Sequence, residues 1–153
     1  MEEQQQPIQS AQPASGAAKS ASAQSSGQAK RVLIVEDEPL LGNLLKQRLG
    51  KEGISVTLVR DGEEALRSLQ NEVPDLVLLD IILPKVSGFE LMEKINSDPA
   101  LAGKKVSIVV ISNLGQEGDV QKGQQLGAIG YFVKAQLSIE GLVSQVREFF
   151  SKN

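Results

Sequence analysis

Five short runs of mostly β-branched and aliphatic residues alternate with amphipathic stretches, and this alternation constrains the fold more than any other feature of the chain. Repeated strand–helix units are typical of parallel α/β proteins, so the pattern predicts one α/β domain. Right-handed crossovers put helices on both faces of the sheet, and we therefore expect a (βα)5 doubly wound parallel sheet of five strands. The runs that we interpret as strands are residues 31–36, 54–59, 75–80, 106–112 and 129–134.

Three of these runs, residues 31–36, 75–80 and 106–112, are almost continuously aliphatic. A strand with one exposed face would alternate apolar and polar residues. The continuous runs are instead typical of parallel strands that are buried on both faces.

The stretches between the runs carry helix signals at their ends. Pro39 suits a first helical turn, Asp61 can cap the next helix, and Ser87 stands three residues before a glutamate, the spacing of a capping box. The stretch 116–126 contains two glycines and few apolar residues, so we expect the weakest helix and the most mobile element there. The predicted helices cover residues 39–51, 61–71, 87–97, 116–126 and 138–150.

Residues 1–29 differ from the rest, because they consist almost entirely of Gln, Ala, Ser, Gly and Pro. This composition offers too little apolar surface for a core, so we expect a disordered tail followed by one folded domain over residues 30–153. A signal peptide would need a basic start and an apolar stretch, but Glu2 and Glu3 stand at this start. A segment that binds a partner is the alternative interpretation.

The residue types that the chain lacks exclude several kinds of chemistry. It has no His and no Cys, which excludes Ser-His-Asp triads, thiolate or histidine metal sites and a phosphohistidine on this chain. The net charge is −3 and no basic run is longer than Lys30-Arg31, so we expect no nucleic-acid partner. No segment approaches the ~18 apolar residues of a membrane span, and we expect no membrane insertion.

Acidic residues follow two of the predicted strands. Glu36 and Asp37 stand at the carboxyl end of the first strand, and Asp80 stands at the end of the third. If these strands are neighbours, three carboxylates converge, and two charges about 4 Å apart repel by roughly 4 kcal/mol at an effective dielectric of about 20. Such a site needs a cation, and a site made only of oxygens suits Mg²⁺ or Mn²⁺.

Two further polar residues end strands at the same edge, Ser112 after the fourth run and Lys134 after the fifth. Phosphoryl transfer spreads charge over three oxygens, which a divalent ion, the Lys134 ammonium and the Ser112 hydroxyl can each stabilise. Asp80 would then be the nucleophile, and the product would be an aspartyl phosphate.

Each of these residues also has an ordinary structural interpretation. Glu36 and Asp37 can cap a helix, and Asp80 can belong to a turn. Ser112 can simply begin a loop, and Lys134 can be a solvated surface lysine. Because four strands deliver complementary groups to one edge of the sheet, the combination favours the chemical interpretation.

Four motifs follow one another at suitable spacings: VLIVEDEP at the first strand, PDLVLLDIILPKVSGFEL around the third, VVIS at the fourth and GYFVKA at the fifth. On these motifs, the chain from about residue 31 to 152 closely resembles the receiver domain of bacterial two-component response regulators. The resemblance implies the CheY-like, flavodoxin-like strand order 2-1-3-4-5. It also implies that Asp80 is the phosphoacceptor.

The resemblance assigns roles around this aspartate. Asp37, Asp80 and the backbone carbonyl of Ile82 would contact Mg²⁺, with Glu36 acting mainly through a bound water.

Other residues would form the switch. By the same resemblance, Ser112 is the switch hydroxyl and Lys134 its cationic partner, while Tyr131 is the aromatic residue whose rotamer reports the state.

Two positions depart from the family pattern. Ala135 stands where a proline, often with a cis bond, commonly follows the lysine, and a cis bond before alanine would cost about 3–4 kcal/mol. We therefore expect a trans bond and a different position for Lys134. Asn113 replaces a small residue after the switch hydroxyl, and we expect it to crowd or hydrogen-bond the phosphoryl group.

The resemblance implies a cytoplasmic single-domain response regulator. Since the chain has no histidine, the phosphoryl group would come from a histidine kinase or phosphotransfer protein. Phosphorylation would change the surface of the fourth helix, fifth strand and fifth helix, and thus binding to an unidentified downstream protein. We expect a switch that phosphorylates and dephosphorylates itself, not an enzyme with an external product.

Three alternatives come from other classes. A degenerate receiver would keep the fold as a constitutive interaction module, but every reactive residue is present here. A flavodoxin-like or dinucleotide-binding enzyme would need a Gly-rich or hydroxyl-rich phosphate loop where this chain has EDEP. A haloacid-dehalogenase-type phosphatase would need a second aspartate at the position of Ile82.

Overall fold

The structure, a computed structural model, describes residues 28–152. In this part of the chain, five strands form one sheet in which all neighbouring pairs are parallel. Counted along the chain, the strand order is 2-1-3-4-5, which confirms the predicted (βα)5 doubly wound α/β fold. In sheet order the strands are β3 (Ser55–Val59), β2 (Arg31–Val35), β4 (Leu76–Leu79), β5 (Ile108–Ser112) and β6 (Ala128–Val133).

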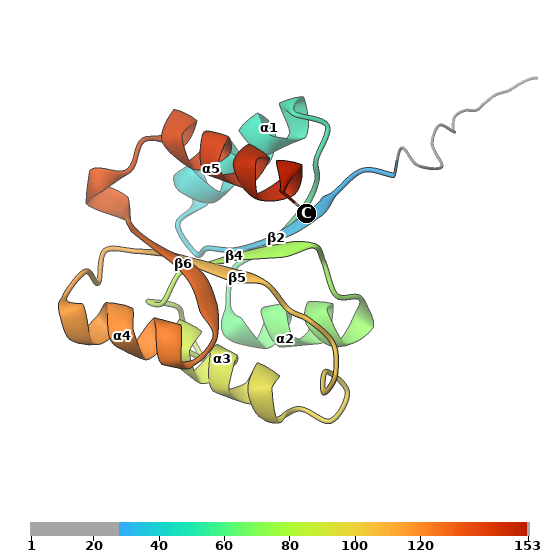
Figure 1. The fold of residues 1–153 in the computed structure, drawn as a ribbon, viewed down its shortest axis with the longest axis vertical. Coiled ribbons are helices and arrows are strands. Elements are labelled where there is room, and N and C mark those ends of the chain that lie inside the picture. Colours follow the sequence, from blue (N-terminus) through green and yellow to red (C-terminus); the bar gives the residue numbers. More distant parts are fainter. Residues whose placement is uncertain (1–27, 153) are drawn as a thin grey trace, which may run out of the picture.

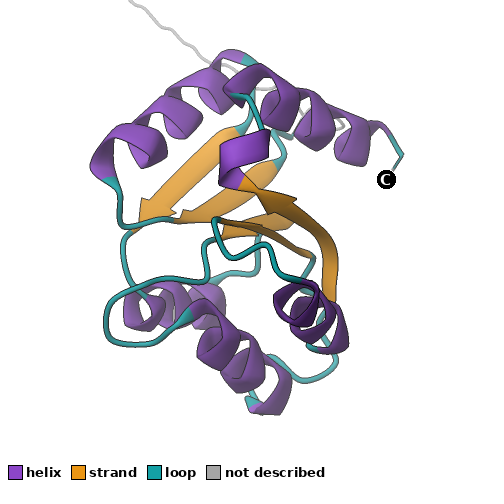
Figure 2. Ribbon diagram, turned by 90° about the vertical axis from the view of Figure 1, so that its left-hand side faces the viewer, coloured by secondary structure: helices purple, strands orange, loops and turns teal. Residues whose placement is uncertain are grey.

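Helices cover both faces of the sheet (Figures 1 and 2). One face carries α1 (Pro39–Lys51) and α5 (Ile139–Ser151). The other face carries α2 (Gly62–Asn71), α3 (Gly88–Ser97) and α4 (Glu117–Gln125). A short 3₁₀ helix, η3 (Lys134–Gln136), follows β6 directly. All helix ends agree with the sequence predictions to within one residue.

The capping residues explain why the helices begin where they do. The Asp61 carboxylate accepts from the Glu64 N–H at 2.9 Å, and Ser87 and Glu90 form the predicted capping box. Pro39 occupies the first turn of α1. The weakest predicted helix does form as α4, where Gly123 is the one buried residue. Its greater mobility stays a prediction.

The core consists of two layers, one on each face of the sheet. Because successive strand residues point to opposite faces, Leu33 and Val35 of β2 pack toward α2 and α3, while Ile34 packs toward α1 and α5. Every residue of β4 and β5 is buried, which confirms the prediction from their aliphatic runs. This packing holds the carboxyl ends of the central strands in fixed register.

The predicted tail, residues 1–29, lies almost entirely outside the described residues and stays a prediction, as does the domain boundary at residue 30. Among the described residues, no helix combines the length and hydrophobicity that a bilayer crossing needs.

Candidate functional site

Glu36, Asp37 and Asp80 meet at the carboxyl edge of the sheet. β2 and β4 are neighbours with Val35 opposite Leu79, so the residues that follow these two strands emerge together. One carboxylate oxygen from each acidic residue lies within 4.8 Å of the other two. Glu36 and Asp80 are buried, whereas Asp37 is exposed, so the cluster opens to solvent on the Asp37 side.

Lys134 completes this cluster from the start of η3. Its Nζ lies 2.7 Å from Asp80 Oδ2 and 2.8 Å from Glu36 Oε1. Burial works against the charged form of the lysine, but the two carboxylates outweigh it and raise the pKa of Lys134. The ammonium group is therefore charged at neutral pH and offsets part of the negative charge of the cluster.

Lys134 reaches the cluster from a backbone without a cis bond. The described peptide bonds are all trans, including the bond before Ala135, as we predicted. The expectation that Lys134 occupies a different position from that in the family pattern stays a prediction. The trans chain turns into η3, and the flexible lysine stem still brings Nζ to Asp80.

The surroundings of Glu36 disfavour its charged form. Burial raises the pKa of its carboxyl group, the charge of Asp80 raises it further, and Lys134 lowers it in part. Oε2 accepts from the Glu38 N–H at 3.1 Å. Oε1 faces the lysine as an ion pair, but among the described residues it meets no donor with hydrogen-bond geometry.

These donors fit a hard divalent cation. Three carboxylates face one ammonium group, so negative charge is in excess, and Glu36 Oε1 is a buried oxygen with spare lone pairs. Oxygen-only donors suit Mg²⁺ or Mn²⁺, and the chain lacks the His and Cys that zinc prefers.

Ser112 and Tyr131 flank the cluster without joining it. The buried Ser112 Oγ accepts from the Leu114 N–H at 3.2 Å, and among the described residues no hydrogen bond connects it to Asp80. The Tyr131 hydroxyl donates to the Leu114 carbonyl. Both side chains are therefore tied to the same residue of the β5–α4 loop.

Comparison with known proteins adds independent evidence. Residues 32–147 match the family model of the response regulator receiver domain. The chain belongs to this family. Receiver domains are signalling domains that bind Mg²⁺ at an acidic pocket and interact with histidine kinases or phosphotransfer proteins.

Individual relatives support the assignment. The receiver domain is 35% identical over 116 residues to the gliding motility regulatory protein of Myxococcus xanthus. The aligned residues make up 76% of this chain and 15% of that protein. It superimposes on a CheY-like receiver domain protein from Methanospirillum hungatei with a TM-score of 0.72 and 27% identity, covering 82% and 96% of the two chains. For the phosphorylated cyanobacterial phytochrome response regulator RcpA, the TM-score is 0.67, the identity 32% and the coverage 80% and 91%.

The curated relatives are longer than this chain, which spans between 15% and 45% of the length of the first matches. Several of them are named as transcriptional regulators. The single-domain organisation and the expected lack of a nucleic-acid partner therefore stay predictions for this receiver domain.

A loop between β4 and α3, residues 80–87, carries Asp80, and we call it the acceptor loop. The Ile82 N–H donates to Asp80 Oδ1 at 3.2 Å, and the Gly88 N–H donates to the Ile81 carbonyl at 2.8 Å. A Cβ atom added to Gly88 would lie 2.5 Å from the Asp80 carbonyl oxygen. Sequence reasoning missed this close approach of the receiver domain's α3, although the motif SGFEL contains the signal.

Apolar side chains lie on the Lys134 side of the acidic cluster. A shallow hollow beside it is lined by Leu40, Leu44, Asn113, Lys134 and Ala135, among others. Leu40 is 84% exposed, an unusually high value for a large apolar side chain. Asn113 and Ala135, the two departures from the family pattern, thus lie together on the rim of the receiver's site.

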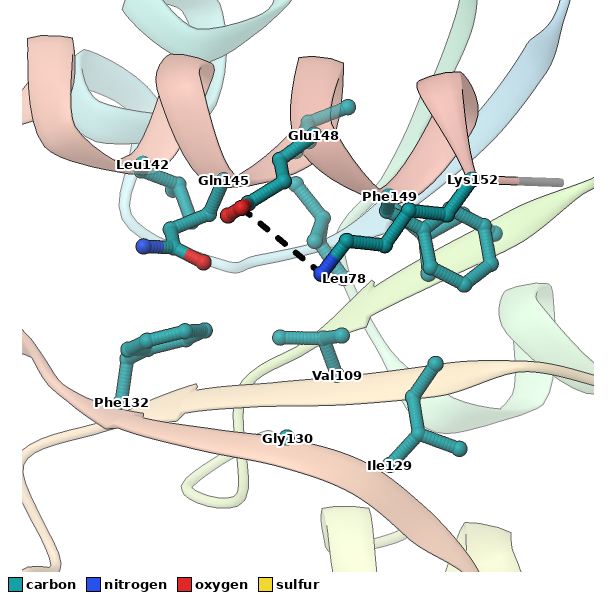
Figure 3. A pocket seen from close by; sticks show the side chains of 12 residues that line it. Leu78, Val109, Ile129, Gly130, Phe132, Leu142, Gln145, Glu148, Phe149 and Lys152 are labelled. Carbon is teal, nitrogen blue, oxygen red and sulfur yellow. Dashed lines mark ion pairs between the residues drawn. The ribbon is translucent and has the colours of Figure 1, made fainter.

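A second hollow lies away from the acidic cluster, between α5 and the strands β4, β5 and β6 (Figure 3). Ile129, Gly130 and Phe132 of β6 form its floor, opposite Leu142 and Phe149 of α5. The ion pair between Glu148 and Lys152, 3.7 Å apart, lies at its rim. None of the predicted site residues lines this hollow.

Proposed function

We propose that this receiver domain is a phosphorylation switch whose phosphoacceptor is Asp80. One observation carries the proposal: the buried Asp80 carboxylate lies beside two other carboxylates and 2.7 Å from the Lys134 ammonium. A structural ion pair would not require a second and third acid in the same place. The arrangement matches what transfer of a highly charged group requires.

Asp80 would act as the nucleophile. One of its carboxylate oxygens attacks phosphorus, while the bond from phosphorus to the donor nitrogen breaks and its electron pair stays on the donor. The Lys134 ammonium lies close enough to stabilise the charge on the phosphoryl oxygens. Ser112 would release the Leu114 N–H and turn toward the new phosphoryl group.

The acidic residues would hold Mg²⁺, with Mn²⁺ as a possible substitute. The ligands we propose are Asp37, Asp80 and the Ile82 carbonyl, with Glu36 acting through a water. When bound, the ion neutralises charge on the transferring phosphoryl group. The excess of carboxylate charge and the buried Glu36 Oε1, which accepts no hydrogen bond from the described residues, support this assignment.

A histidine kinase or a phosphotransfer protein would supply the phosphoryl group, because the chain itself has no histidine. Leu40 and Leu44, which line the hollow beside Lys134, and Ile82 of the acceptor loop are exposed apolar residues, and they would form the docking surface for that protein. The structural neighbour RcpA is known in a phosphorylated form, which supports the proposal.

The output would be binding of a downstream protein to the surface of α4, β6 and α5. Tyr131 connects this surface to the β5–α4 loop, and the hollow beside Ile129 offers apolar area for a partner (Figure 3). In this role the domain is a switch that catalyses only its own phosphorylation and dephosphorylation. We expect it in the cytoplasm, as is typical of two-component response regulators.

The decisive experiment is incubation with acetyl phosphate and Mg²⁺, followed by intact mass measurement. The wild-type protein should gain one phosphate, and Asp80→Asn should gain none. Glu148→Gln, which changes an exposed carboxylate far from the cluster, should gain phosphate like the wild type. No gain by the wild type would favour the degenerate, constitutively binding receiver instead.

A further inference from the structure

The first turn of α2 holds the acceptor loop although it contributes no group to the acidic cluster. Gly62, the first residue of this helix, is buried, and a Cβ atom added to it would lie 2.5 Å from the Val86 carbonyl oxygen and 2.6 Å from Val86 Cβ. Its φ is not in the left-handed region. The glycine is therefore required for space, because the backbone of the acceptor loop packs directly against it.

Charges add a second attachment between α2 and the acceptor loop. The Lys85 ammonium lies 3.6 Å from Asp61 Oδ2 and 3.7 Å from Glu63 Oε1. Asp61 is buried, and it also accepts from the Glu64 N–H, so its carboxylate is fixed in place. Lys85 is itself held at a φ of 69°, the one positive value among the described non-glycine residues.

The two ends of the acceptor loop are thus held by different helices. Gly88 of α3 packs against the Asp80 backbone at the start, and Gly62 of α2 packs against Val86 near the end. α2 and α3 lie side by side beneath the sheet (Figure 1). A loop held at both ends keeps the residues between them, including Ile82, in one position.

We propose that Gly62 and Lys85 are positioning residues for the divalent cation. They keep the acceptor loop where the Asp80 carboxylate and the Ile82 carbonyl can bind the ion together. This inference rests on the proposed function, since it takes the acidic cluster to be the cation site. The new element is that α2, which provides no ligand, helps to determine the affinity of the site for the cation.

The test is the Mg²⁺ affinity of the unphosphorylated protein, measured by isothermal titration calorimetry. Gly62→Ala should weaken binding about tenfold, the usual effect of disturbing groups that orient metal ligands. Gly50→Ala is the matched control, because nothing lies within 4 Å of a Cβ atom added there, and it should bind like the wild type. Thermal unfolding with EDTA separates a loss of stability from a loss of affinity.

Substitution of Lys85 adds no steric clash, so it tests the inference even if Gly62→Ala does not fold. Lys85→Met should weaken Mg²⁺ binding about two- to fivefold, because exposed ion pairs are individually weak, and Lys85→Arg should restore it. Wild-type affinity in both Gly62→Ala and Lys85→Met, even with a lower melting temperature, would overturn the inference. Absence of Mg²⁺ binding by the wild type would instead overturn the proposed cation site itself.

Discussion

Lys134 Nζ lies 2.7 Å from Asp80 Oδ2, although the two residues are 54 positions apart in the chain. The same ammonium lies 2.8 Å from Glu36 Oε1, so one cation serves two buried carboxylates. In the protein without a divalent ion, the lysine is the internal counterion of the cluster. Removal of its charge should therefore affect the stability of the fold as well as its chemistry.

Lys134→Met should lower the free energy of unfolding by about 3 kcal/mol in EDTA, because it leaves two buried carboxylates without a counterion. Urea unfolding followed by circular dichroism measures this change. Mg²⁺ should recover part of the loss, since a bound ion supplies positive charge at the same place. Phosphorylation by acetyl phosphate should be slower than in the wild type.

Lys152→Met is the control for this prediction. Lys152 is exposed and pairs with Glu148 at 3.7 Å, and surface pairs of this kind contribute about 0–1 kcal/mol. If both lysine variants lost the same small amount of stability, the Lys134 ammonium would not be the counterion of a buried cluster.

Glu36→Gln should make the protein without Mg²⁺ more stable at neutral pH. Burial raises the pKa of the Glu36 carboxyl group above its ordinary value of 4.5, so the folded protein binds more protons there than the unfolded chain. The Glu36 contribution to stability then falls as the pH rises from about 4.5 through the folded pKa. The variant should consequently be more stable than the wild type at about pH 7.5, with a smaller difference near pH 4.5.

Urea unfolding in EDTA at several pH values measures this difference. Glu148→Gln, at an exposed position, should show no such pH-dependent gain. A constant difference between wild type and Glu36→Gln across the whole range would contradict the raised pKa of Glu36.

Asp37→Asn should separate cation binding from stability. Asp37 is exposed, so the free energy of unfolding in EDTA should change by less than about 0.5 kcal/mol. Mg²⁺ at about 100 times its dissociation constant should stabilise the wild type by about 2.7 kcal/mol. With tenfold weaker binding, the same concentration would stabilise the variant by only about 1.4 kcal/mol. Equal Mg²⁺-dependent shifts in melting temperature would show that Asp37 is not a ligand.

Much of the fold could be predicted because local signals agreed with one another. The aliphatic runs ending at Val35 and Leu79 predicted buried parallel strands, and the caps at Asp61 and Ser87 fixed helix starts to within one residue. The convergence of Glu36 with its acidic neighbours followed from strand order, because parallel strands end at one edge.

The remaining features depend on distances that a one-dimensional pattern does not contain. The sequence could not show that Lys134 reaches two carboxylates, because the place of its Nζ depends on the rotamers of a long flexible side chain. It also could not show that Gly62 and Gly88 are packing positions, because glycine occurs at many helix starts without a close neighbour. Only Gly53, Gly103 and Gly127 among the described glycines need glycine for a positive φ.

Gly123→Ala should disturb the conformation of Tyr131. A Cβ atom added at Gly123 would lie 3.1 Å from Tyr131 Cδ2 and 3.3 Å from Cε2, closer than the ring tolerates without moving. Overpacking of this kind costs about 1 kcal/mol, enough to shift a two-state rotamer equilibrium about fivefold. The variant should therefore populate ring positions that are less buried against α4.

The pKa of Tyr131 reports this change directly, because the chain contains one tyrosine and no tryptophan. Burial, together with the charges of Asp119 and Asp80, raises the pKa of its hydroxyl above the ordinary 10.0 in the wild type. A titration of tyrosinate absorbance should find a lower pKa in Gly123→Ala, closer to 10.0. Gly118→Ala, in the same helix with nothing within 4 Å of the added Cβ atom, should keep the wild-type value. Identical titrations of all three proteins would mean that α4 does not control the conformation of Tyr131, and the route from the acidic cluster to the α4 surface would have to use other residues.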